Sequence, residues 1–299
     1  KVFSIYRIGD VGLLLAMWAS HHLFHENITF MKLNNYELVN EHLQNHSIIG
    51  IFIALCLACA AAAKSAQIPF SSWLPRAMEG PTPSSAIFYG SLSVHLGVFL
   101  MLRTFPFWEH QTTMRFAIGL MGLTTSLAAS VMARVQSSVK SQVAYSSISQ
   151  IGIIFIEIAL GFETLALIHF AGNAFLRTYQ LLVSPSVVSY LIRDQFYNFK
   201  PREKAIEDSY PKKIEYTLYI LALKEFNLEG FLNMVLWKPL KIIGKSLDFL
   251  NIKRIYFFFI PIYLMGFLAY KFKVDLPQQL ISVLPEVFAF IGLVFVFKS

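Results

Sequence analysis

The sequence predicts an all-α polytopic membrane protein, on the strength of its composition, its repeated apolar stretches and the placement of its basic residues. Of the 299 residues, 56% are hydrophobic and only 14% are charged, whereas about a quarter of a soluble domain is charged. Apolar stretches recur at about 20 residues, the length of a helix that crosses the hydrocarbon core. The net charge of +7 gathers at the ends of these stretches and in one polar segment, which indicates membrane topology rather than nucleic-acid binding.

We expect eight transmembrane helices, two of them broken, plus a cytoplasmic amphipathic helix. The predicted spans cover 2–24, 47–69, 83–103, 114–134, 141–160, 163–191, 255–273 and 279–297. They divide the chain into a transmembrane domain, a cytoplasmic loop with an interfacial helix over 227–249, and a transmembrane hairpin, at 1–192, 193–250 and 251–299. For 227–249, a polar connector without membrane contact is the alternative. Because the first span begins directly after Lys1, we expect a fragment that lacks upstream helices.

Lys64 lies inside an apolar run, in "CAAAAKSAQIPF", five residues before Pro69. A lysine at the centre of a bilayer costs about 2.5–3.5 kcal/mol, so it normally faces a bundle interior or a wet cavity. A buried amine can gain or lose its charge as an acidic neighbour approaches or leaves. Pro69 prevents a continuous helix, and a broken helix beside an ionisable group is typical of transporter sites. The alternative is a lysine that extends to the headgroups.

Other ionisable residues lie in or near the first two predicted spans. Arg7 and Asp10 are three residues apart on one helix face and can pair, for structural or for functional reasons. Glu79 precedes the helix-start residues Thr82 and Pro83, and we expect it at the cytoplasmic rim. His95 is a candidate proton relay or a hydrogen-bonded packing residue.

A polar stripe occupies the span over 163–191. His169, Asn173 and Arg177 are spaced four residues apart and therefore share one helix face. Such a stripe can hold a file of waters for protons, or it can join neighbouring helices by hydrogen bonds. Glu157, a carboxylate within an apolar run, ends the preceding span. "SPS" at 184–186 is expected to interrupt the stripe helix, which makes it the second broken span.

No pattern of cofactor or metal ligands appears in the sequence. The two cysteines, Cys56 and Cys59, lie in an apolar run, where small packing residues are the favoured interpretation over a redox pair. Two cysteines are too few for iron–sulfur ligation. We therefore expect no cofactor and no metal in this chain, and at most a subunit of a redox enzyme rather than an enzyme by itself.

Several stretches, in this order, resemble the antiporter-like membrane subunits of respiratory complex I, subunit L (chain 5) above all, and of Mrp-type cation/proton antiporters. They are "YRIGDVG", "KSAQIPFSSWLPRAMEGPTPSSA", "VKSQVAYSSISQIG" and the helix from His169 to Arg177. The resemblance covers about residues 1–190. It implies inverted repeats, a proton channel in each half, and Lys64 as the central lysine, partnered by a glutamate on an upstream helix. It also places Arg7, Asp10 and Lys140 at polar positions of the family.

The chain departs from the family pattern at several polar positions. Tyr89 stands where a histidine is usual, and Asn173 and Arg177 stand in place of a histidine and a lysine. Arg177 cannot release a proton at physiological pH. Ser138 replaces an acidic residue before Lys140. These departures suggest a divergent stand-alone paralogue.

The sequence therefore predicts a subunit that moves protons, or Na⁺, across a membrane, coupled to the chemistry of a partner. Its partners are expected to be other membrane subunits or one large soluble subunit, in a bacterial inner membrane, with no nucleic acid. Two alternatives are a membrane subunit of a DabAB-type inorganic-carbon uptake system, which such a paralogue would resemble, and a membrane anchor that translocates nothing.

Overall fold

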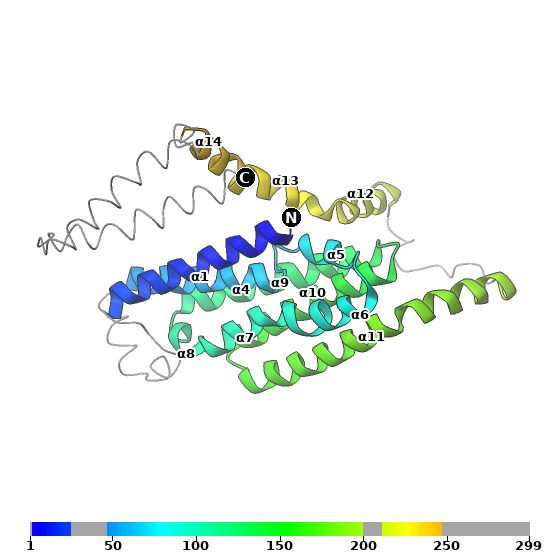
Figure 1. Ribbon diagram of the computed structural model, residues 1–299, viewed down its shortest axis with the longest axis horizontal. Helices are drawn as coiled ribbons and strands as arrows, with labels where there is room; N and C mark the ends of the chain where they lie inside the picture. The colour runs from blue at the N-terminus through cyan, green and yellow to red at the C-terminus, as the bar shows by residue number, and fades with distance from the viewer. Residues whose placement is uncertain (1, 25–46, 200–210, 247–299) are drawn as a thin grey trace, which may run out of the picture. The chain divides into compact units, whose positions relative to one another are not determined.

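A computed structural model describes residues 2–24, 47–199 and 211–246 of the chain. Every regular element in these ranges is helical, and no strand occurs in them (Figure 1). The chain divides into two compact units, Lys1–Leu228 and Glu229–Ser299. The all-α prediction is confirmed.

Five long helices build most of the first unit: α1 (Val2–Phe24), α4 (Ser47–Lys64), α9 (Thr112–Arg134), α10 (Val139–Leu160) and α11 (Glu163–Tyr197). A sixth, irregular rod joins α6 (Thr82–Ser84), the π-helix η1 (Ser85–Leu92), the 3-10 turn η2 (Ser93–His95) and α7 (Leu96–Arg103). The shorter elements are α5 (Trp73–Ala77), α8 (Phe105–Trp108), α12 (Lys212–Leu223) and the turn η4 (Glu225–Asn227).

Among the described residues, four helical rods are long and apolar enough to cross a bilayer: Val2–Phe24, Thr82–Arg103, Thr112–Arg134 and Val139–Leu160. Ile48–Lys64 is a shorter apolar helix. Large apolar side chains such as Phe116 and Leu127 point outward, although an exposed apolar surface of this extent is unfavourable in water. The chain is an integral membrane protein. The predicted spans 255–273 and 279–297 lie outside the described residues.

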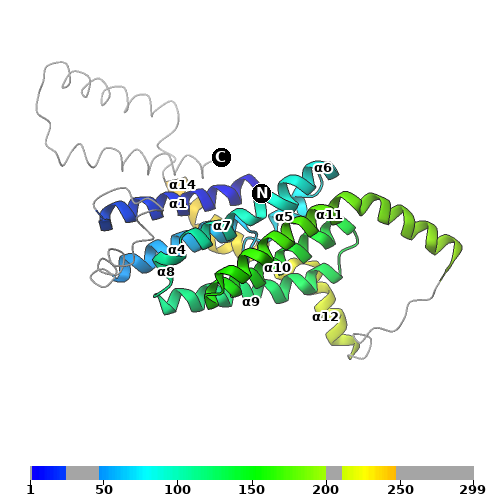
Figure 2. The ribbon, with the colours of Figure 1, turned by 90° about the horizontal axis from the view of Figure 1, so that it is seen from below.

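Helix α10 forms the centre of the first unit, between α9 and α11 (Figure 2). Its side chains Tyr145, Ile151 and Phe155 are buried. The contact with α9 is close because a Cβ added at Gly122 would lie 2.5 Å from the carbonyl oxygen of Gly152. Small residues of this kind let membrane helices approach each other, where lipid provides no hydrophobic drive for association.

The predicted break in the stripe helix is wrong. Helix α11 runs without interruption through Pro185. Proline removes the backbone donor that would bond to the carbonyl of Leu181, and the Ser184 hydroxyl donates to that same carbonyl oxygen at 2.8 Å. Serine side chains of this kind re-satisfy backbone groups that a proline frees in a membrane helix.

The segment after α11 holds one helix that the sequence analysis did not predict. Residues 212–223 form α12, where a polar loop was expected. Farther on, α13 (Leu228–Leu232), the π-helix η5 (Asn233–Trp237) and α14 (Lys238–Ser246) make residues 228–246 helical. The proposed contact of this stretch with the membrane interface stays a prediction.

Candidate functional site

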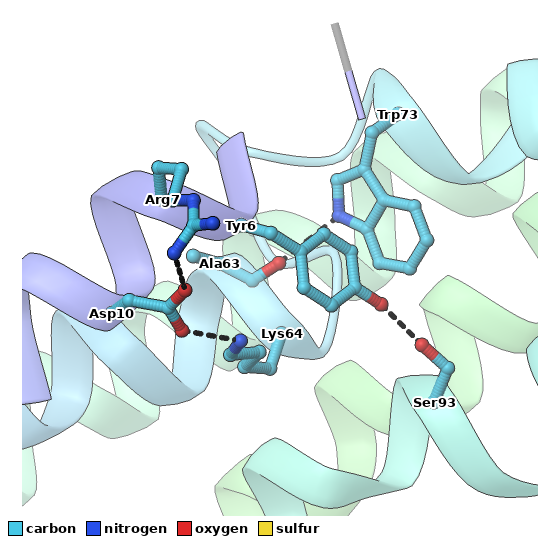
Figure 3. Close-up of polar contacts among 7 residues, drawn as sticks. All are labelled: Tyr6, Arg7, Asp10, Ala63, Lys64, Trp73 and Ser93. Carbon is cyan, nitrogen blue, oxygen red and sulfur yellow. Dashed lines mark hydrogen bonds and ion pairs between the residues drawn. The ribbon is translucent and has the colours of Figure 1, made fainter. Parts of the chain in front are cut away.

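Lys64 is the last residue of α4, so the helix ends four residues before Ile68, the last position that Pro69 alone would allow. Ala66 takes a left-handed conformation with φ of 53°. The backbone N–H of Gln67 donates to the carbonyl oxygen of Ala62 at 2.9 Å. This is the hydrogen-bond pattern of a Schellman helix end. The Trp73 indole donates to the next free carbonyl, that of Ala63, at 3.0 Å (Figure 3). The helix end that carries Lys64 is therefore held by two hydrogen bonds, one from the backbone N–H of Gln67 and one from the indole of Trp73.

The ammonium of Lys64 pairs with a carboxylate from another helix. Its Nζ atom lies 2.7 Å from Oδ1 of Asp10, on α1, and Nη1 of Arg7 lies 3.6 Å from Oδ2 of the same carboxylate (Figure 3). The side chain of Lys64 is 24% exposed, against 40% for Asp10 and 51% for Arg7. Gly9 makes this approach possible, because its missing Cβ would lie 3.1 Å from Cβ of Ala63.

An aromatic ring covers the same ammonium. The Nζ atom of Lys64 lies 4.5 Å from the ring centroid of Tyr6, a cation–π distance. The Tyr6 hydroxyl bonds to that of Ser93 on η2, and its ring meets Trp73 edge-on at 5.0 Å. Tyr6 thus connects the Lys64 group to the irregular rod.

His169 belongs to a second group, on α10 and α11. Its Nδ1 lies 2.8 Å from Oε1 of Glu157, and its Nε2 lies 3.0 Å from Oε1 of Gln150. The other carboxylate oxygen of Glu157 is buried and has no hydrogen-bond partner in the structure. Since an amide can present its oxygen or its NH₂ group, Gln150 can accommodate His169 with one proton or with two.

Asn173 and Arg177 form a third group, together with His95. Nε of Arg177 donates to Oδ1 of Asn173 at 3.1 Å, and Nδ2 of Asn173 lies 3.1 Å from Nε2 of His95. Nδ1 of His95 lies 2.8 Å from the carbonyl oxygen of Ser91. The predicted stripe therefore belongs to two separate groups: His169 bonds to residues of α10, whereas Asn173 and Arg177 form a chain of hydrogen bonds with His95.

The remaining candidates lie apart from these groups. Nζ of Lys140 donates to the carbonyl oxygen of Gly80 at 3.1 Å. Glu79 is exposed, and its backbone N–H donates to the carbonyl oxygen of Arg76 at 3.3 Å. Within the described ranges, no cluster of three or more His, Cys, Asp or Glu side chains could hold a metal ion.

The sequence model of the NADH:quinone oxidoreductase/Mrp antiporter transmembrane family matches residues 1–199. The chain belongs to this family. The match covers α1 to α11 and hence all three polar groups described above.

Individual relatives are similar to this chain over a stretch of about the same length. The chain is 36% identical over 191 residues to NAD(P)H-quinone oxidoreductase subunit 5, chloroplastic, of Piper cenocladum, covering 63% of this chain and 25% of the relative. It is 35% identical over 190 residues to NADH-ubiquinone oxidoreductase chain 5 of Halichoerus grypus, covering 63% and 29%. The chain thus spans less than a third of the length of these relatives.

Sequence reasoning missed several residues that contact the polar groups described above. Tyr6, Trp73, Ser93 and Gln150 carry no charge, so a search for ionisable residues in apolar spans overlooks them. Glu225 was missed because it lies beyond the polar loop, yet its Oε1 accepts a 2.8 Å bond from the buried Tyr145 hydroxyl. The pairing of Lys64 with Asp10 joins residues 54 positions apart, and the helical spacing rule pairs only near neighbours.

Proposed function

We propose that this chain moves protons, or Na⁺, across a membrane as part of an antiporter-like subunit of an NADH:quinone oxidoreductase-type complex. The observation that carries the proposal is the contact between Nζ of Lys64 and Oδ1 of Asp10 at the end of α4, where the two side chains are partly exposed. The family match and the names of the relatives support it.

Asp10 has two competing cationic partners, and this competition supplies a mechanism. Paired with Asp10, the amine of Lys64 is stabilised in its protonated form. When the carboxylate turns fully to Arg7, which keeps its charge at all physiological pH values, the ammonium of Lys64 loses that stabilisation and transfers its proton to a water molecule, which can reach the side chain because it is 24% exposed. A return of Asp10 favours uptake of the next proton.

The second group, His169 with Glu157 and Gln150, is a place where a proton can be held. His169 has an acceptor oxygen beside each ring nitrogen, so it can carry two protons without losing a hydrogen bond. The unpartnered Oε2 of Glu157 can take up a proton or bond to a water. We propose that protons pass through this group and through the Lys64 group.

The proposed partners are other membrane subunits, since the relatives are named as subunits or chains of quinone oxidoreductases. One named relative is a chloroplast protein and another comes from a mammal. A bacterial inner membrane therefore remains only a prediction for this chain.

Lys64 variants test the proposal. Proton flux into proteoliposomes is measured with an internal pH dye for the wild type, Lys64→Ala and Lys64→Arg. We expect both variants to lose most of the flux, because arginine keeps the charge but cannot release the proton. Flux at the wild-type level in Lys64→Ala would falsify the assignment.

A non-translocating membrane anchor is the second candidate, because Lys64 and His169 both bond across helices. If the anchor function holds, Lys64→Ala and His169→Ala lower assembly with partner subunits, and wild-type proteoliposomes show no protein-dependent flux. Size-exclusion chromatography of the complex, run beside the flux assay, separates the two functions.

A further inference from the structure

We propose that Arg177 is a fixed-charge barrier that stops passive cation passage along α11, an inference that rests on the proposed translocation function. The barrier would confine proton movement to groups that can take up and release a proton. Arg177 itself is not such a group, because its guanidinium stays charged.

The guanidinium is buried among neutral groups. Arg177 is 8% exposed, and its three nitrogen types donate to Oδ1 of Asn173 at 3.1 Å, Oε1 of Gln180 at 2.7 Å and the carbonyl oxygen of Ser146 at 3.3 Å. Within the described part of the chain, the ion pairs found around the polar groups join Arg7 or Lys64 to Asp10 and His169 to Glu157, and none includes Arg177. Its positive charge is thus solvated by dipoles and is not neutralised.

The neighbours of Arg177 cannot pass a proton without breaking a bond. Asn173 uses its oxygen to accept from Arg177, so its NH₂ group faces Nε2 of His95 and must donate to it. His95, 2% exposed, then keeps its proton on Nδ1, which donates to Ser91. A second proton on Nε2 would collide with the NH₂ group of Asn173. Each hydrogen bond from Arg177 through Asn173 and His95 to Ser91 therefore donates in the same direction, and none of these groups can accept a further proton without breaking a bond.

Arg177 also lies well inside α11, far from either end of the helix. It is 177 − 163 = 14 residues into α11, about 21 Å along the helix at about 1.5 Å per residue. The surrounding helices are in close contact, since a Cβ at Gly90 of η1 would lie 3.0 Å from Leu181 and 3.6 Å from the backbone of Arg177. A cation that follows the polar face of α11 therefore has to pass next to the guanidinium.

Polar groups beside Arg177 would otherwise favour hydration. The hydroxyl of Ser147, the residue after the Ser146 acceptor, is buried without a hydrogen-bond partner, and such groups in proteins commonly bind water. A fixed arginine in a narrow polar passage raises an electrostatic barrier to protons and metal cations. The geometry thus combines a buried hydroxyl that can bind water with a charge that repels cations.

Passive leak is the measurement that tests the barrier. Proteoliposomes carrying full-length protein in the Lys64→Ala background, which removes the proposed Lys64-dependent flux, are loaded with a pH dye and assayed in parallel for ²²Na⁺ uptake. Arg177→Gln, which removes the charge, is expected to raise both leaks about tenfold. Arg177→Lys, the matched control, keeps a cation and should leave the ²²Na⁺ leak at the level of its background; the proton leak is not compared in this control, because a lysine can take up and release a proton.

Equal ²²Na⁺ leaks in folded Arg177→Gln and Arg177→Lys would overturn the barrier while leaving the Lys64 result of the proposed function intact. If Arg177→Gln does not fold, Asn173→Asp replaces it, because that change places a carboxylate at the Nε contact and neutralises the guanidinium without loss of volume. Raised leaks in Asn173→Asp support the barrier, and leaks no higher than in the background refute it.

Discussion

Asp10 on α1 holds the ammonium of Lys64 at the end of α4, with 2.7 Å between Oδ1 and Nζ. The contact needs two features at once: a helix that stops at Lys64 and a neighbouring helix that comes close at Gly9. It puts a titratable amine and a carboxylate within direct proton-transfer distance, and the carboxylate has a second cation, Arg7, to turn to.

Asp10→Asn tests the role of the carboxylate. We expect proton flux through Lys64 to fall about tenfold, because asparagine cannot exchange charge with the amine. Arg7→Gln should lower the flux by a similar factor, because it removes the second cation to which the carboxylate turns when Lys64 releases its proton. Both are measured in the same proteoliposome assay; flux at the wild-type level in Arg7→Gln contradicts the proposed competition for Asp10.

Trp73→Phe tests the helix end. Phenylalanine keeps the edge contact with Tyr6 but loses the indole donor to the Ala63 carbonyl, which leaves a buried acceptor unpaired. The expected loss in the free energy of unfolding is about 1–3 kcal/mol, measured by thermal unfolding in detergent. No change in melting temperature would mean that another donor, such as water, holds this carbonyl.

Much of this arrangement follows from the sequence. The apolar spans over residues 2–160 correspond to helices within a few residues, because length and composition together determine what can cross a bilayer. The broken helix at Lys64 was also predicted, although its end is fixed by Ala66 and Trp73 rather than by Pro69. The predicted break at Pro185 is wrong, because the hydroxyl of the preceding residue, Ser184, donates to the carbonyl that the proline leaves without a backbone donor.

The grouping of polar residues could not be predicted from spacing. His169 and Asn173 share a helix face, yet they bond to different helices: His169 to α10, and Asn173 to His95 on the irregular rod. Which partner each finds depends on how η1 and η2 present His95 to α11. Neither the π-helix nor the 3-10 turn has a signature in the residue types at 85–95.

A double-mutant cycle tests the His169–Glu157 contact. His169→Gln and Glu157→Gln should each lower proton flux, and the double variant should lose little more than the worse single one, because coupled residues are not additive. His95→Gln should lower the melting temperature but reduce flux less than His169→Gln, since His95 is locked to Asn173. Additive losses at residues 169 and 157 would show that they act independently.

Glycine variants test the packing of the bundle independently of transport. Gly122→Val should lower the free energy of unfolding by about 1–3 kcal/mol, because a Cβ there meets the Gly152 carbonyl oxygen at 2.5 Å. Gly172→Ala is the control: its Cβ has nothing within 4 Å, and alanine in a helix interior is favoured by about 0.5–1 kcal/mol. Similar melting temperatures for both variants would contradict the close α9–α10 contact.

Chemical replacement of the amine at residue 64 is the sharpest test of whether proton flux depends on a titratable amine at this position. Cys56 and Cys59 are the only cysteines in the sequence, so Lys64→Cys can be made in a Cys56→Ala/Cys59→Ala background and alkylated selectively. We expect proton flux to be absent in the unmodified variant and to stay absent after neutral carbamidomethylation. Flux should return after aminoethylation, because this modification restores a titratable amine. Equal flux after the two alkylations would contradict this expectation.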